Sequence, residues 1–355
     1  MANEKQAAKA QPKMTPSYFV DDNGFAYHKS AYFDAAGKIE CQKRASVVVV
    51  GSNFSSAAGT AVNRYLTEGT EYSCPSASAD AIDIRNGDYP LSAANRVLVN
   101  HAMSKADFIG KPVKLGVTLP FRDFYTPDGA INEARRAAVS KNFSIKVDVV
   151  GSVAQPQIEA VHVWAEGISA FFDWALRSDG SANPQFEEME DSPMAVIDIG
   201  GQTTDIVSLL YDGRELVIDN KRSETKEIGV LDAIKAVQTR VSQSLAVKQG
   251  GTSSMYDQIP LQVAERILQT GKGRIGADEQ DFSDLRNQVL REHSEMILAF
   301  IKSKLGNLNN YPILYFIGGG AIVFKDVLKS PNAQFGDEFS NARGALKYMR
   351  YIAAV

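Results

Sequence analysis

Short runs of alternating apolar and polar residues occur near the start of the chain and again about halfway along it. Each place predicts three short strands joined by tight turns, at residues 17–22, 26–33 and 38–44, and then at 194–198, 204–210 and 215–220. In both units an aspartate ends the first strand directly before a glycine-containing turn, at Asp22 and at Asp198. A unit that recurs once in this way predicts two related lobes rather than a repeat array.

The rest of the chain mixes strand and helix patterns. Strands are predicted at 113–119, 144–150 and 313–317, and helices at 131–140, 158–176, 230–242, 261–269, 284–305 and 341–351. Residues 177–192 are polar, contain Asp-Gly and Asn-Pro, and include an acidic run, which is typical of a linker. Strands and helices in this order predict an α/β fold with a crossover between lobes at that linker.

Composition and charge limit the classes of function. The chain has 355 residues, of which 44% are hydrophobic, and its 38 basic and 42 acidic side chains nearly balance. This length allows two or three lobes with separate cores. A balanced charge gives no broad cationic surface for a phosphate backbone, so we expect no direct binding to nucleic acid.

Neither a membrane segment nor a cysteine site is predicted. No apolar run approaches the roughly 20 residues that cross a bilayer, so we expect no membrane contact. Residues 1–16 are polar and rich in alanine and lysine, which predicts a disordered tail. Cys41 and Cys74 lack metal-ligand spacing and fit a reducing, cytoplasmic setting.

Three glycine-rich turns that follow predicted strands carry the candidate chemistry. They are Asp22-Asn23-Gly24 with Lys29 on the next strand, the segment from Asp198 to Asp205 with Gly200, Gly201, Gln202 and Thr203, and Gly318-Gly319-Gly320. Glycine lets the main chain approach an anion and turn its N–H groups toward it. The two aspartates could hold Mg²⁺ through its waters, and Lys29 could contact phosphates. No P-loop motif is present, and the one GxGxxG, at residues 271–276, follows a predicted helix rather than a strand, so the turns predict a nucleotide site of another kind.

These turns resemble the motifs of the superfold shared by actin, the heat-shock chaperone ATPases and the sugar kinases. Asp22-x-Gly24 with Lys29 is similar to its first phosphate motif, residues 198–205 to its second, and residues 316–320 to its adenosine motif. Within the superfold the chain most resembles the bacterial plasmid-segregation actins of the ParM/StbA family. Supporting segments are residues 116–120, 227–229 and 339–344.

The resemblance covers about residues 17–355 and implies an actin-like fold, with two pseudo-symmetric RNase H-like lobes around a nucleotide cleft. Domain I is expected at 17–190, with about 35–95 as its smaller subdomain and with 325–355 completing it. Domain II is expected at 191–324, with about 224–285 as its smaller subdomain.

The resemblance also implies roles for the turn residues. Asp22 and Asp198 would organise Mg²⁺ and its waters, and Asp198 would help to polarise the attacking water. The phosphates would be held by Gly24 and Lys29 from one lobe and by Gly200, Gly201, Gln202 and Thr203 from the other. Gly318, Gly319 and Gly320 would back the nucleoside.

Hydrolysis also needs a residue that orients water in line with the γ-phosphate. In the family it begins the helix after the strand predicted at 144–150, where Pro156-Gln157 occurs here. Gln157 is therefore the expected residue, with Glu159 as the alternative. A neutral amide is a poor proton acceptor, so slow turnover would follow. A plain helix cap is the structural alternative for Gln157.

The pair His162 and Glu166 has a structural explanation that does not require a metal. His162 and Glu166 are four residues apart in the predicted helix at 158–176, among apolar residues and with no further ligand nearby. A packed or paired histidine is favoured there over a metal site.

The function implied is that of a cytoplasmic bacterial ATPase that forms filaments with itself when it holds ATP, and whose hydrolysis to ADP weakens them. Such filaments segregate plasmid DNA through a DNA-binding adaptor of the ParR type at a centromere-like site. Mg²⁺ is the expected metal, and GTP stays open as an alternative nucleotide.

A small-molecule kinase of the same superfold is the alternative function, although we find no further aspartate motif to act as its base. A chaperone-type ATPase would need a peptide-binding domain after Gly320, and too few residues follow for one.

Overall fold

A computed structural model describes residues 15–51, 63–78, 80–187, 189, 192–213, 215–248 and 258–355. The predicted tail at 1–16 lies outside the described residues except for its last two positions. The predicted boundary between residues 190 and 191 also lies outside them.

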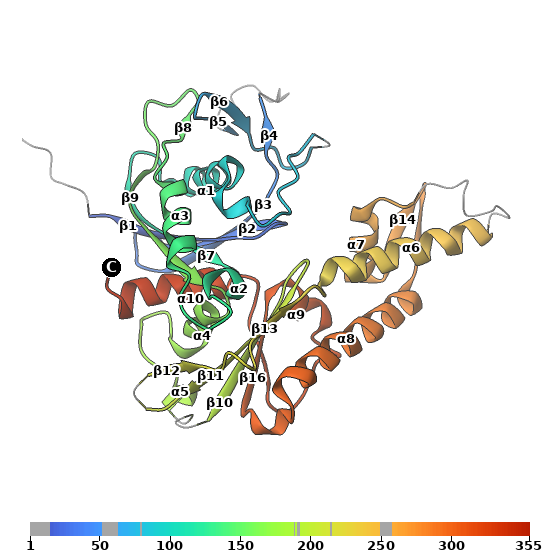
Figure 1. Cartoon of the computed structure of the whole chain (residues 1–355). Helices are drawn as coiled ribbons and strands as arrows, with labels where there is room; N and C mark the ends of the chain where they lie inside the picture. The colour runs from blue at the N-terminus through green and yellow to red at the C-terminus, as the bar shows by residue number, and fades with distance from the viewer. Residues whose placement is uncertain are drawn as a thin grey trace, which may run out of the picture.

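A five-stranded sheet forms the centre of the upper lobe in Figure 1, in the order β3-β2-β1-β7-β9. The first three strands are antiparallel hairpins, and β7 and β9 run parallel to β1. Helices α1 and α3 cover one face, and α10 covers the other. The bounds are β1 (Ser17–Asn23), β2 (Tyr27–Phe33), β3 (Ile39–Ala45), β7 (Pro112–Leu119), β9 (Gln157–Ala165), α1 (Ala93–Lys105), α3 (Glu133–Phe143) and α10 (Ser340–Lys347).

A second sheet of six strands repeats this arrangement in the lower lobe. Its order is β12-β11-β10-β16-β17, with β13 also paired to β11, and β16 runs parallel to β10 as β7 does to β1. Helices α6, α8 and α9 share one core with this sheet, and α4 packs on its other face. The bounds are β10 (Pro193–Ile199), β11 (Thr204–Tyr211), β12 (Leu216–Ile218), β13 (Glu224–Lys226), β16 (Ile313–Ile317), β17 (Ala333–Phe335), α4 (Ile168–Ala175), α6 (Val230–Lys248), α8 (Ser283–Leu305) and α9 (Gly318–Phe324).

Each lobe carries a smaller unit. Beside the first sheet lies a four-stranded sheet, β4 (Val49–Val50), β6 (Thr70–Ser73), β5 (Arg64–Thr67) and β8 (Asp148–Val149). Beside the second, the hairpin of β14 (Lys272–Ile275) and β15 (Asp278–Asp281) packs on α7 (Leu261–Thr270), which packs on α6, and this unit extends away from the sheet in Figure 1. Short elements complete the chain: η2 (Tyr89–Leu91), α2 (Phe121–Phe124), α5 (Pro184–Glu187), η3 (Leu308–Asn310) and the π-turn η4 (Tyr348–Ile352).

Helices α4 and α10 lie against each other between the two sheets (Figure 1). Helix α10 packs on β1, β2 and β7 of the first sheet, while α4 contacts β9 of the first and β10 of the second. These two helices therefore join the lobes.

The structure confirms an α/β fold and the two strand units on which that prediction rests. The strand predicted at 313–317 has the same bounds as β16. The strand predicted at 144–150 was too long, because only Asp148 and Val149 pair with the small sheet.

The helix predicted at 158–176 was wrong over its first half. Residues 157–165 form strand β9, and helix α4 begins only at Ile168. Val163 packs into the core beneath α3, whereas Trp164 contacts Tyr348 on the opposite face, with ring centres 5.0 Å apart. Residues 160–165 of β9 are apolar at five of six positions, so the period of two is hidden in this half of the strand.

Candidate functional site

The first hairpin pairs Asp22 on β1 with Lys29 on β2. Lys29 Nζ donates to Asp22 Oδ2 at 2.7 Å, and the lysine side chain keeps 19% of its surface exposed, whereas Asp22 is buried. A Cβ on Gly24 would lie only 3.0 Å from the Tyr27 carbonyl oxygen, so the turn leaves little room for a side chain. The hairpin thus presents one ammonium and one carboxylate at the end of β1.

The second hairpin places Asp198 on β10 opposite Asp205 on β11. Its turn is closed by the Gly200 N–H, which donates to the Thr203 carbonyl at 2.8 Å. The Thr203 hydroxyl donates to Asp205 Oδ2 at 2.9 Å, and the Thr225 hydroxyl donates to the same carboxylate. These bonds fix the turn and hold Asp205 in place.

The start of α6 closes over the same turn. Leu231 N–H donates to the Gly201 carbonyl at 2.8 Å. A Cβ on Gly229 would lie 2.6 Å from the Gly201 carbonyl carbon, so the helix can approach only because residue 229 is glycine. Gly201 itself faces open space.

The third glycine segment opens helix α9 directly after β16. Gly318 has φ = +84°, and a Cβ there would overlap with Asp198 Oδ1 and lie 2.6 Å from the Ile199 carbonyl oxygen. Gly320 also abuts Ile199, whereas Gly319 has nothing within 4 Å. Glycine at 318 is therefore required for the close approach of this segment to Asp198.

Gln157 does not lie at this site, which corrects the expected role of that residue. It is the exposed first residue of β9 and pairs with Pro112, the first residue of β7. Because β9 and β7 run parallel to β1, Gln157 lies where these strands begin, whereas Asp22 lies where β1 ends. The two residues are therefore at opposite ends of the strands. Glu159, two residues further along β9, is also near the beginning of that strand.

Glu166, which follows the last residue of β9, occupies the position that Gln157 was expected to fill. The Thr118 hydroxyl donates to Asp22 Oδ1 at 3.1 Å and lies 3.3 Å from Glu166 Oε1, so both carboxylates flank one buried threonine. Helix α4 starts two residues later. Glu166 thus begins the strand-to-helix turn beside Asp22.

The charges of the two hairpins form one electrostatic cluster. Burial alone would lower the pKa of Lys29, but Asp22, Asp198 and Glu166 together raise it. The pKa of Asp198 is raised to about 7, chiefly by burial and also by the neighbouring carboxylates Asp22 and Asp205. Lys29 and a hydrogen bond from Asn341 act in the opposite direction.

Glu166 responds in the same way. Burial raises its pKa well above the ordinary value, and the negative charges of Asp22, Asp205 and Asp198 raise it further. Several carboxylates therefore share one lysine, and burial followed by their mutual repulsion raises the pKa of Glu166 and of Asp198. A divalent cation fits this set, because it would favour the ionised form of each carboxylate.

Within the described part of the chain, no group of three or more histidine, cysteine, aspartate or glutamate side chains is arranged to hold a metal directly. Among the same residues, no helix is both long and apolar enough to cross a bilayer. Two separate carboxylates can still hold Mg²⁺ through its retained waters.

His162 lies on β9 and stacks on Trp164, and burial lowers its pKa.

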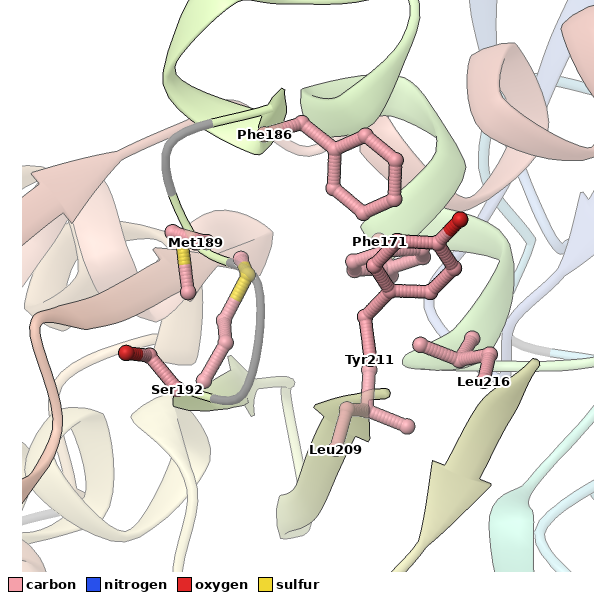
Figure 2. Close-up of a pocket in the computed structure, with 8 residues that line it drawn as sticks. Phe171, Phe186, Met189, Ser192, Leu209, Tyr211 and Leu216 are labelled. Atoms are coloured by element: carbon pink, nitrogen blue, oxygen red, sulfur yellow. The ribbon is translucent and has the colours of Figure 1, made fainter. Parts of the chain in front are cut away.

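The apolar pocket in Figure 2 is separate from the charged cluster. It lies among α4, β10, β11 and β12 and is lined by Phe171, Phe186, Leu209 and Tyr211, among others. No lining residue is charged. A second, polar groove is lined by α4, α10 and the β16–β17 region, and there Asp173 accepts hydrogen bonds from Arg343 and Lys347.

Two family descriptions match consecutive parts of this chain. Residues 18–176 match the N-terminal domain of the plasmid segregation protein ParM, and residues 196–330 match the C-terminal domain of the archaeal MreB-like actin homologues. The chain is an actin-like protein that matches the ParM/StbA family over its first part and the archaeal MreB-like actin homologues over its second. A search of the curated proteins finds no sequence match.

Solved structures of ParM-type and archaeal actins share the fold. A 15-stranded ParM filament from Clostridium botulinum superposes with a TM-score of 0.73 at 17% identity, covering 95% of this chain and 99% of the other. The archaeal actin homologue Ta0583 gives 0.72 at 18% identity, covering 94% and 99%. Its complex with ADP gives 0.69 at 17% identity, covering 95% and 99%. At these identities the likeness shows the fold.

Proposed function

We propose that this ParM-type chain is an ATPase that assembles into filaments when it holds ATP and leaves them after hydrolysis to ADP. We further propose that the filaments segregate plasmid DNA in the bacterial cytoplasm through an adaptor of the ParR type. The observation that carries the proposal is that groups from both sheets meet at one place. Lys29 bonds to Asp22, Thr118 lies between Asp22 and Glu166, and Asn341 joins the turn after Glu166 to Asp198 of the second sheet.

The residues that would hold the nucleotide come from both sheets. Lys29 and the Gly24 turn would contact phosphates from the first lobe, and the turn at 200–203 would do so from the second. Residues 318–320 would back the nucleoside. Asp22 and Asp198 would bind Mg²⁺ through water, and the bound ion would supply the positive charge that a triphosphate beside these carboxylates requires.

Glu166 is the residue that we assign to orient the attacking water, in place of Gln157. Its carboxylate is flanked by Thr118 and lies in the same electrostatic cluster as Asp22 and Asp198. An ionised carboxylate accepts a proton more readily than a neutral amide, so the slow turnover argued from an amide no longer follows.

Coupling of hydrolysis to assembly would use the joint between the lobes. A nucleotide that contacts residues of both sheets would favour one relative orientation of the sheets, and release of its phosphate would remove that preference. Helices α4 and α10 connect the sheets, so a change at the site would alter the surface that each subunit offers to the next. The balanced charge of the chain supports DNA contact through an adaptor rather than directly.

The test combines assembly and hydrolysis in one sample of purified full-length protein. Mg-ATP should raise right-angle light scattering above a critical concentration and yield pelletable polymer, and scattering should fall as phosphate accumulates. Mg-ADP serves as the control and should give no lasting polymer. Phosphate transfer only when a sugar or other acceptor is added, with no polymer, would instead identify a small-molecule kinase.

A further inference from the structure

Asn341, in the first turn of α10, contacts the ends of both large sheets. Its Oδ1 accepts a hydrogen bond from the Gly167 N–H at 2.9 Å, and its Nδ2 donates to Asp198 Oδ2 at 2.7 Å. Gly167 directly follows Glu166 at the end of the first sheet, and Asp198 lies near the end of β10 in the second. One side chain, 3% exposed, therefore joins the Glu166 turn to Asp198.

The two bonds suit an amide in particular. The Gly167 N–H is buried and requires an acceptor, while the Asp198 carboxylate requires a donor. The asparagine amide offers a donor and an acceptor on separate atoms of one uncharged end, whereas a carboxylate would face Asp198 with a like charge. A leucine of similar size would supply neither bond.

The Gly167 turn and the helix that carries Asn341 are both held in place by their surroundings. Gly167 has φ = +75°, and a Cβ there would lie 2.6 Å from Val207 Cγ2 of β11, so its turn is pressed against the second sheet. On the other side, Arg343 of α10 makes two hydrogen bonds to Asp173 of α4, at 2.8 and 2.6 Å. These contacts hold the backbone on either side of the hydrogen bond between Gly167 and Asn341.

We propose that Asn341 is a positioning residue that sets the placement of Glu166 relative to Asp198 and so links the two lobes at the reacting centre. This inference rests on the proposed ATPase function. Asn341 makes no hydrogen bond to Lys29 or to the phosphate-binding turns in the described structure. Its loss should therefore slow the chemical step and leave nucleotide affinity largely unchanged.

The experiment compares two variants of the full-length chain with a matched control. Asn341→Leu removes both bonds, and Asn341→Asp keeps the acceptor for Gly167 while replacing the donor to Asp198. Ser340→Ala is the control, because Ser340 is equally buried on the same turn but contacts Tyr315 and Asp337 instead. Amide hydrogen exchange at Gly167 is measured without nucleotide, and turnover and Mg-ATP affinity are measured separately.

Asn341→Leu should speed exchange at Gly167 by about tenfold or more, because the amide loses its partner. It should lower turnover by about 10- to 100-fold, as expected for a small misplacement of reacting groups, while Mg-ATP affinity stays within about threefold. Asn341→Asp should keep the Gly167 amide protected and still lose turnover. Ser340→Ala should match the wild-type protein in all three measurements.

Normal turnover in Asn341→Leu, or unchanged exchange at Gly167, would overturn the inference. An equal loss of affinity and turnover would also do so, because it would point to general damage of the site. If the wild-type chain hydrolyses no ATP, the proposed function fails, and the bridge is then judged on amide exchange alone.

Discussion

Glu166 is the side chain whose chemistry depends most on its neighbours. It lies beside Thr118 at the end of the first sheet, and burial together with Asp22, Asp205 and Asp198 raises its pKa. Lys29 opposes that rise but also interacts with Asp22 and Asp198. The residue is thus placed to hold a water and accept its proton when further positive charge is bound.

Replacement of Glu166 by glutamine should separate binding from hydrolysis. Glu166→Gln keeps the size of the side chain and removes the proton acceptor, so phosphate release should fall by about 100-fold or more. Mg-ATP should still bind, and filaments should persist longer in the light-scattering assay.

Gln157→Ala is the matched comparison, because Gln157 lies at the opposite end of the strands of the same sheet. It should release phosphate at the wild-type rate. The reverse pattern, with Gln157→Ala inactive and Glu166→Gln active, would show that the assignment of Glu166 is wrong.

The sequence could predict Asp22, Lys29 and Asp198 as candidates because turn residues and adjacent apolar strands mark them locally. Glu166 was missed for a reason of the same kind. The apolar pattern around it predicts a helix that also includes His162. Glu166 in fact follows the last residue of β9, and no turn residue precedes it to mark the end of that strand. The Glu166-Gly167 step was the one available clue.

The crossing of α4 and α10 is the element on which the joint between the lobes depends. A Cβ on Gly344 of α10 would overlap with the Ser169 carbonyl oxygen and lie 2.7 Å from the Asp173 nitrogen. Both atoms belong to the backbone of α4, so neither can rotate away. The two helices can approach this closely only through glycine.

Gly344→Ala should therefore destabilise the protein. The added methyl group would push α10 away from α4, and overpacking of this kind lowers the free energy of unfolding by about 1 to 3 kcal/mol. Chemical denaturation measures this change. Gly87→Ala is the control, because a Cβ at Gly87 meets nothing within 4 Å and its φ is not positive, so its free energy of unfolding should stay close to that of the wild type. Equal stability of both variants would contradict the tight crossing.

Elements were predicted best where one pattern repeats. The hairpins of β1–β3 and β10–β12 follow from alternating residues broken by Asn-Gly, Gly-Gly and Asp-Gly turns. Helix α1 was not predicted, because Asn, Arg and His occur along it and are buried by contacts that only the tertiary fold provides. Strands β14 and β15 read Lys-Gly-Arg-Ile and Asp-Glu-Gln-Asp, which show no strand period.

At the scale of the whole molecule, two similar sheets bring their hairpin turns to one place. Asp22 and Lys29 come from the first sheet and Asp198 comes from the second. Asp22 and Asp198 both raise the pKa of Lys29, while Lys29 lowers the pKa of Asp198. Separate hairpins on unrelated surfaces would not interact in this way. The duplicated strand order therefore brings residues of both lobes to one site, where they would bind the same ligand.

Isothermal titration of Mg-ATP into the wild-type chain, Lys29→Ala and Asp198→Ala tests the shared site most directly. We predict one nucleotide per wild-type chain and a loss of affinity of about tenfold or more in each variant, because each hairpin supplies part of the grip on one charged ligand. An affinity that depends on only one of the two residues, or no binding by the wild type, would contradict a site built from both sheets.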